Sequence, residues 1–279
     1  MATKINDMDM LHLALMAGLG LLVGFIGTLI GAGGGFILVP ILLILYPDLK
    51  PEVITSISLG VVFVNATSGS IAYARMKRID YKSAIVFAIA TLPGSIIGAF
   101  LTSYIPRNTF DLILGFLLLI ISIFLIINPR QGALAGKNKN QNHVHREITD
   151  KSGQHYAYSF NIWTGIILSF FVGFLSSLLG IGGGIIHVPA LTSLLNFPIH
   201  VATATSHFIL AIMALSGTIV HIYQGNFKGG GWKTALAIAP GIIIGAQLGA
   251  YYSHKIKGVW IVRSLALALL LVSIRLIFM

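Results

Sequence analysis

Ten apolar segments make up most of this chain, and eight of them have about the 20 residues that a helix needs to cross a lipid bilayer. Only 9% of the 279 residues are charged, whereas soluble domains carry roughly 25%. The apolar runs are continuous, which excludes the short alternating strands of a membrane barrel. The sequence therefore predicts an all-α polytopic membrane protein in a lipid bilayer. The segments are Met10–Ile30, Phe36–Tyr46, Val53–Ala74, Ser83–Tyr104, Phe110–Ile127, Ile162–Leu179, Ile185–Leu195, Val201–Tyr223, Thr234–Ser253 and Val259–Phe278.

The two shorter segments each follow a run of glycines. Residues 31–40 read GAGGGFILVP and residues 180–189 read GIGGGIIHVP. Two further matches occur in the same order, at offsets of 147 to 148 residues: Ser68-Gly69-Ser70 with Ser216-Gly217-Thr218, and Pro93-Gly94 with Pro240-Gly241. These matches indicate an internal duplication. We expect two homologous repeats, residues 1–128 and 160–279, each with about five helical segments: three to four full crossings and one glycine-broken half-helix.

The charges in the loops do not decide the relative orientation of the repeats. A polar linker, residues 129–159, is expected to be solvated, cytoplasmic and without regular structure. If every segment crosses, the repeats are inverted; if the half-helices turn back, the repeats are parallel. Both arrangements satisfy the positive-inside rule, and we favour the inverted one because it brings the glycine runs together from opposite faces. Loop residues also explain the net charge of +10, so no nucleic-acid partner is expected.

The glycine runs predict a binding site for a small anion. A break followed by a half-helix leaves amide N–H groups without intrahelical partners, and the helix dipole adds partial positive charge there. The substrate-binding glycines are expected to be Gly33, Gly34, Gly35, Gly182, Gly183 and Gly184. The alternative is close helix packing, which we favour for the pairs Gly20/Gly24 and Gly27/Gly31. Neither run fits a dinucleotide or P-loop pattern, so no cofactor is expected.

Four polar side chains at membrane depth are further candidates for substrate binding. They are His187, Asn65, Ser206 and His207. All eight acidic residues lie at termini, loops or helix starts, so a buried carboxylate is not available for ion coupling. Proton coupling would have to use histidine. The competing explanation is that these side chains only bond neighbouring helices together.

The paired GxGGGxxxVP motifs, with the half-helices behind them, resemble those of the sulfite exporter TauE/SafE family of membrane permeases. The resemblance covers nearly the whole chain apart from the linker. It implies a multi-pass permease of the cell (inner) membrane that moves sulfite, sulfonates or sulfoacetate-type anions. His187 departs from the symmetry of the motifs, because the first motif has Leu38 at that position.

Two other functions remain as alternatives. A divalent-metal transporter would use intramembrane histidines, but the chain has no cysteine and no acidic residue within a span, so no metal site is expected. An intramembrane enzyme would need a nucleophile with its base, and no catalytic residue can be assigned from serine and histidine abundance alone. The direction of transport and the oligomeric state are left open.

Overall fold

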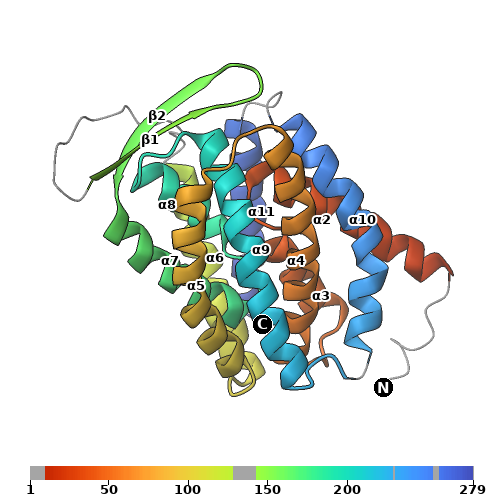
Figure 1. The fold of residues 1–279 in the computed structure, drawn as a ribbon. Helices are drawn as coiled ribbons and strands as arrows, with labels where there is room; N and C mark the ends of the chain where they lie inside the picture. The colour runs from red at the N-terminus through yellow and green to blue at the C-terminus, as the bar shows by residue number, and fades with distance from the viewer. Residues whose placement is uncertain (1–9, 128–142, 229, 254–257, 279) are drawn as a thin grey trace.

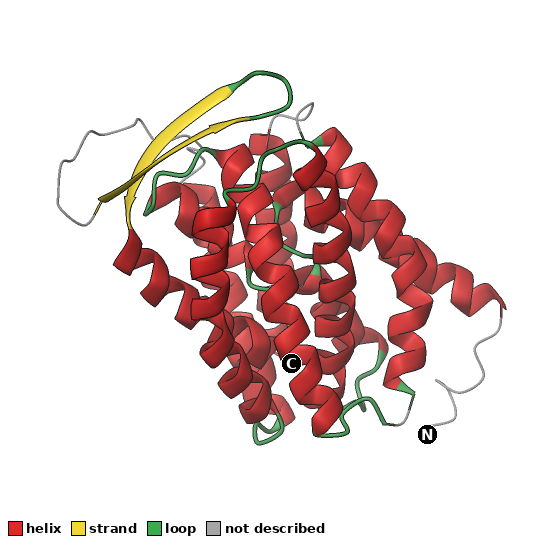
Figure 2. Cartoon of the chain, viewed as in Figure 1, coloured by secondary structure: helices red, strands yellow, loops and turns green. Residues whose placement is uncertain are grey.

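The computed structural model of the protein describes residues 10–127, 143–228, 230–253 and 258–278. Within these ranges the chain forms ten helices and one two-stranded sheet (Figures 1 and 2). Every predicted apolar segment is a helix, with ends that differ from the prediction by at most three residues. The helices are α2 (Met10–Ile30), α3 (Gly35–Leu45), α4 (Pro51–Arg75), α5 (Tyr81–Thr102), α6 (Arg107–Ile127), α7 (Ile162–Leu179), α8 (Gly184–Ser193), α9 (Ile199–Tyr223), α10 (Gly231–Tyr252) and α11 (Gly258–Phe278).

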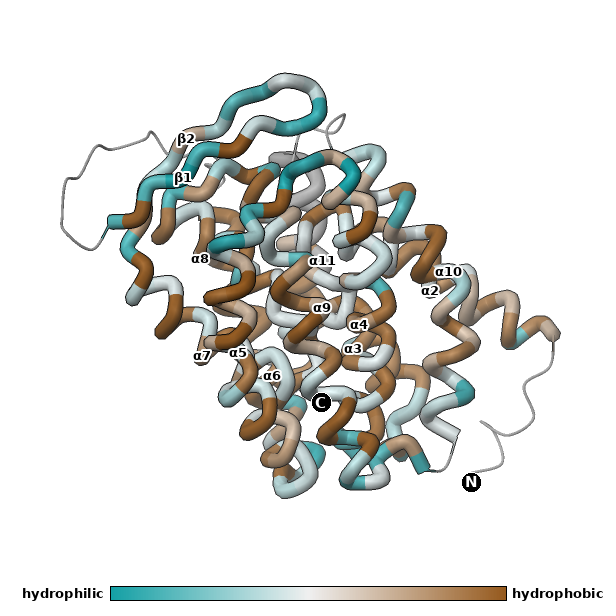
Figure 3. Tube along the Cα trace, viewed as in Figure 1, coloured by the Kyte–Doolittle hydropathy of each residue, from teal (hydrophilic) through white to brown (hydrophobic). Residues whose placement is uncertain are grey.

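Within the described residues, seven helices are long and apolar enough to cross a membrane, namely α2, α4, α5, α6, α7, α9 and α10. Large apolar side chains such as Ile89, Phe171 and Ile219 are exposed on them, as expected for lipid-facing positions. Figure 3 shows hydrophobic residues along the helices and hydrophilic ones gathered at the hairpin and the loops. The helices α3 and α8 have 11 and 10 residues, about half the length of a crossing.

Glycines allow two pairs of helices to pack with their backbones in contact. In the pair α2–α10, a Cβ atom on Gly20 would meet the carbonyl oxygen of Ile238, and one on Gly241 would meet that of Ala17. In the pair α5–α7, a Cβ atom on Gly94 would meet the carbonyl oxygen of Phe170. Only glycine permits so close an approach. The predicted packing role of Gly20 and Gly24 is confirmed, because Gly24 lies against Ile242 in the same way.

The expectation of an irregular linker is wrong for residues 143–161. This segment forms an antiparallel hairpin of β1 (His143–Thr149) and β2 (His155–Asn161), which lies over one end of the helices (Figure 1). Tyr158 and Phe160 are buried, with ring centroids 4.5 Å and 5.0 Å from that of Phe197. Aromatic side chains that alternate along β2 therefore give the polar segment an apolar face. Residues 129–142 lie outside the described residues.

Ionic and polar contacts fasten the hairpin to the loop between α4 and α5. Arg78 donates to Asp150 at 3.2 Å, and Arg146 lies 3.6 Å from Asp80. Tyr158 donates its hydroxyl to Asp80 at 2.7 Å. Burial raises the pKa of Tyr158 and the Asp80 carboxylate raises it further, so this hydroxyl remains a neutral donor. The contacts place Arg78 and Arg146 at one end of the molecule, where the positive-inside rule predicts the cytoplasm.

The Asp150–Arg78 contact predicts an acid-sensitive element of stability. Burial favours the protonated carboxyl, but hydrogen bonds from Ser152, Gln154 and Arg78 outweigh it and lower the pKa of Asp150 to about 2 from 3.8. A lowered folded-state pKa gives stability that is present above the unfolded pKa and is lost as pH falls through the folded value. We therefore expect the Tm of the purified protein to exceed that of Asp150→Asn at neutral pH. The gap should narrow between about pH 4 and pH 2, and a gap independent of pH would contradict this account.

Candidate functional site

Both glycine runs interrupt the helices, as predicted. The first break, residues 31–34, separates α2 from α3, and the second, residues 180–183, separates α7 from α8. Three glycines in each break have positive φ: 82°, 78° and 82° at Gly31, Gly33 and Gly34, and 69°, 78° and 50° at Gly180, Gly182 and Gly183. Residues with a side chain rarely adopt a positive φ, which explains why these positions are glycine. Gly31 therefore belongs to the break, and its predicted pairing with Gly27 in straight helix packing is wrong.

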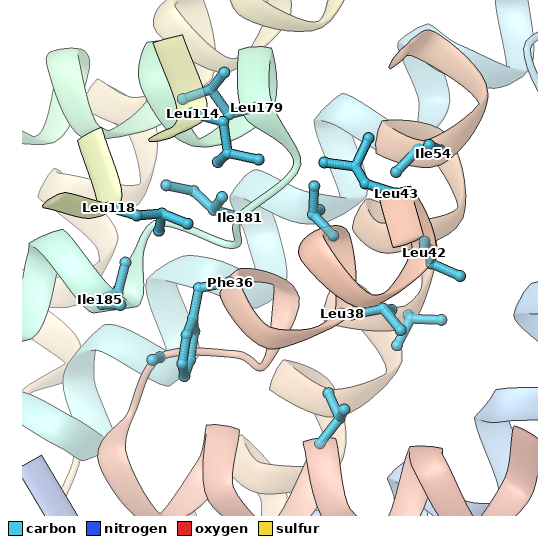
Figure 4. Packing of buried hydrophobic residues seen from close by; sticks show 14 of the residues in the cluster. Phe36, Leu38, Leu42, Leu43, Ile54, Leu114, Leu118, Leu179, Ile181 and Ile185 are labelled. Atoms are coloured by element: carbon cyan, nitrogen blue, oxygen red, sulfur yellow. The ribbon is translucent and has the colours of Figure 1, made fainter. Parts of the chain in front are cut away.

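The two breaks lie directly against each other. A Cβ atom on Gly35 would lie 2.5 Å from the carbonyl oxygen of Gly180, and one on Gly184 would lie 2.6 Å from Cα of Ala32. A Cβ atom on Gly33 would lie 3.4 Å from the carbonyl oxygen of Gly182. The side chains that follow the breaks belong to one buried apolar cluster, drawn in Figure 4 with Phe36, Ile181 and Ile185. Gly33, Gly35, Gly182 and Gly184 thus meet at one place beside apolar side chains, whereas Gly34 lies against Val23 of α2 and Gly183 against Ser176 of α7.

Some backbone donors at this contact have no partners, although the amides of Ala32, Gly33 and Gly184 are bonded. Within the described residues, the amides of Gly34 and Phe36 in the first break donate to no acceptor, nor do those of Gly183 and Ile185 in the second. All four residues are buried. A buried N–H group without a partner is rare and costly, so a set of four calls for an acceptor. The N-termini of α3 and α8 supply the electrostatic field that favours an anion.

The carbonyl oxygens of the breaks, in contrast, are satisfied by serines. Ser58 donates to the carbonyl oxygen of Gly180 at 2.6 Å, and Ser206 donates to that of Gly31 at 3.2 Å. Ser206, a predicted site residue, therefore contacts the first break. The hydrogen bond from the Ser206 hydroxyl stabilises the break. It also satisfies the Gly31 carbonyl oxygen, which would otherwise repel an anion.

A group of buried polar side chains lies beside the first break, and we call it the Thr28 cluster. It consists of Thr28, Asn65, Tyr73 and His207. Thr28 donates its hydroxyl to Asn65 Oδ1 at 3.0 Å, and His207 Nε2 lies 3.2 Å from the same hydroxyl oxygen. Tyr73 donates to the Thr28 carbonyl oxygen at 2.8 Å. The structure thus brings together two predicted site residues, Asn65 and His207, through a threonine that the sequence analysis missed.

His187 lies apart from this cluster. Its Nε2 atom is 3.4 Å from the Ser169 hydroxyl, and its ring centroid is 6.4 Å from that of Phe87. His221 is near the other end of α9, where Asn226 lies 2.8 Å from its Nδ1 atom. In the described part of the chain, no three His, Cys, Asp or Glu residues come close enough together to hold a metal ion. The arrangement of histidines gives the metal-transport alternative no support.

The position of Thr28 in the sequence could have identified it as a candidate site residue. It lies in the last turn of α2, three residues before Gly31, so its hydroxyl had to fall close to the break. Ser58 also matches Ser206 at the repeat offset of 148 residues, which would have singled it out from its serine-rich neighbourhood.

Comparison with known proteins identifies the family of the chain. Residues 16–276 match the family model described as sulfite exporter TauE/SafE. A probable membrane transporter protein of Bacillus subtilis, YunE, is 36% identical over 266 residues, which are 93% of this chain and 95% of the relative. A probable membrane transporter protein of Methanocaldococcus jannaschii is 30% identical over 269 residues, 92% of each chain. No solved structure matches the chain. This multi-pass membrane protein belongs to the sulfite exporter TauE/SafE family of membrane transporters.

Proposed function

We propose that the protein is a secondary transporter for a small sulfur-containing anion such as sulfite, a sulfonate or sulfoacetate. The anion would be held between the two breaks by the free amides of Gly34, Phe36, Gly183 and Ile185. The observation that carries the proposal is the set of buried, unpartnered N–H groups where two helix N-termini meet. Asn65 and His207 would line the same site, while His187 remains a prediction from the motif alone.

The distribution of charge supports an anionic substrate. In the described spans, acidic residues occur only near the helix starts: Glu52 lies in the first turn of α4, and Asp111 is the fifth residue of α6. Asp111 is paired with Arg107 at 2.8 Å. A carboxylate beside the breaks would repel an anion, whereas bare amides hold one without a permanent positive charge.

We further propose that the chain consists of two inverted repeats that share this site. Helices α4 and α9, which correspond at the repeat offset, run in opposite directions. Ser56 in the second turn of α4 donates to the carbonyl oxygen of Asn226, which follows α9. The amide of Asp80, which follows α4, donates to Thr205 near the start of α9. The packing of α2 on α10 and of α7 on α5 is the relation that such a symmetry requires. Movement of one repeat against the other would open the shared site to either side.

Ligand-dependent thermal stability tests the substrate class. We expect sulfite and methanesulfonate to raise the Tm of the purified full chain, since a ligand at 100 times its Kd stabilises the folded state by about 2.7 kcal/mol. Chloride at the same ionic strength is the control for salt. Stabilisation by zinc and by neither anion would contradict the proposal. Counterflow of labelled sulfite into proteoliposomes then tests transport directly.

A further inference from the structure

The Thr28 hydroxyl lies between the buried imidazole of His207 and the buried amide of Asn65. Because the hydroxyl has a single proton, it can donate to only one of these two groups. Because Thr28 donates to Asn65 Oδ1, its oxygen can only accept from the ring nitrogen 3.2 Å away. His207 must therefore carry a proton on Nε2, which leaves the lone pair of the neutral ring on Nδ1. The tautomer follows from the hydrogen-bond network.

This arrangement leaves two buried polar atoms unpaired beside the first break. Among the described residues, neither Nδ1 of His207 nor Nδ2 of Asn65 has a hydrogen-bond partner, and both residues are fully buried. Nδ2 is a donor suited to an anion, but a neutral Nδ1 is an acceptor and would repel one. Once protonated, Nδ1 becomes a second donor with a positive charge.

The surroundings of the ring can accommodate that charge only together with an anion. The Tyr73 ring meets the His207 ring edge-on, with a distance of 5.7 Å between the ring centroids. Tyr73 is the titratable neighbour from α4. In the described part of the chain, α2, α4 and α9 bring no Asp, Glu, Lys or Arg against the ring. An imidazolium here would lack a counter-charge, and a bound anion would supply one.

We propose that binding of the anion is coupled to protonation of His207 at Nδ1. This proposal rests on the proposed function. One proton from solvent adds to Nδ1, Nε2–H continues to donate to Thr28, and the new Nδ1–H faces the anion together with Asn65 Nδ2. No other bond forms or breaks. A monoanion and one proton make the occupied site electrically neutral, which lowers the cost of a charge in this buried, apolar setting.

The proton site, which combines His207 of the second repeat with Thr28 and Asn65 of the first, has no counterpart beside the second break. At the repeat offset of 148 residues, Leu59 corresponds to His207 and Met213 corresponds to Asn65. Both are buried apolar side chains. The coupling therefore involves one proton for each anion, and the cluster beside the first break makes the site asymmetric.

Titration calorimetry in two buffers of different ionisation enthalpy counts the protons that accompany binding. The probe for proton counting is methanesulfonate, whose charge does not change near neutral pH. Sulfite exchanges a proton of its own in this range, so it serves as a second anion for binding only. For the wild-type full chain we expect uptake of about one proton for each anion, so that the Kd weakens about tenfold for each unit rise in pH. His207→Gln should take up none. The matched control is His221→Gln, another buried histidine of α9, which should behave as wild type.

The outcomes separate this proposal from the one on which it rests. If wild type binds the anions without proton uptake, or if His207→Gln takes up as many protons, the coupling is refuted while anion binding stands. If wild type binds neither anion, the proposed function fails and the coupling fails with it. Should His207→Gln not fold, Thr28→Val tests the same network, because Nε2–H then lacks its acceptor. That variant should take up fewer protons, and unchanged uptake would also refute the coupling.

Discussion

Gly184→Ala is expected to abolish binding of sulfite and to destabilise the protein by about 1–3 kcal/mol. Gly184 does not have a positive φ, so its backbone conformation accepts alanine, and the effect arises from contact alone. The added methyl group would lie 2.6 Å from Cα of Ala32 and 3.0 Å from its carbonyl carbon. These atoms belong to the backbone of the other break and cannot turn aside as a side chain would. The two breaks must separate, and the amides no longer converge on one anion.

The matched control for this substitution is Gly18→Ala in α2. A Cβ atom on Gly18 would have no neighbour within 4 Å. We expect this variant to keep both its Tm and its affinity for sulfite. Binding by folded Gly184→Ala with wild-type affinity would show that the contact between the breaks is not needed for the site.

Asp80→Ala is expected to lower stability by about 3–5 kcal/mol, the usual cost of removing one member of a buried charged pair. The side chain of Asp80 caps α5 by accepting from Ser83 N at 3.1 Å, and it also accepts the Tyr158 hydroxyl and faces Arg146. Its removal leaves all three groups without their acceptor. Both strands of the hairpin would lose their contact with Asp80, since Arg146 and Tyr158 pair directly across the strands, and a protease added to the folded protein should cut residues 143–161 faster.

Asp48→Ala provides the comparison, since Asp48 is an exposed loop residue. Its Tm and its rate of cleavage should equal those of wild type. The role assigned to Asp80 would be wrong if both aspartate variants unfolded at the same temperature.

Hydropathy predicted the helices and glycine content predicted the breaks, because helices and breaks each depend on residues that are adjacent in the sequence. The length of an apolar run determines whether it crosses, and three glycines end a helix wherever they occur. The contact between the breaks was expected only from the favoured inverted arrangement, and the structure places Gly35 against Gly180.

The Thr28 cluster and the hairpin were harder to predict because they depend on contacts between distant residues. Thr28 and His207 are 179 residues apart, and Tyr158 and Asp80 are 78 apart. A single threonine in an apolar helix carries no pattern of its own. The polar composition of the linker concealed the alternating aromatic residues of β2, whose burial depends on Phe197 in a different part of the chain.

The position of a bound selenite ion, the selenium counterpart of sulfite, tests the central claim most directly. Its anomalous scattering would locate the anion in crystals of the full chain, and sulfite should displace it. We expect the selenium peak within hydrogen-bond distance of the free amides at Gly34, Phe36, Gly183 and Ile185, with Asn65 and His207 alongside. A peak that sulfite displaces but that lies away from both glycine breaks would contradict the account.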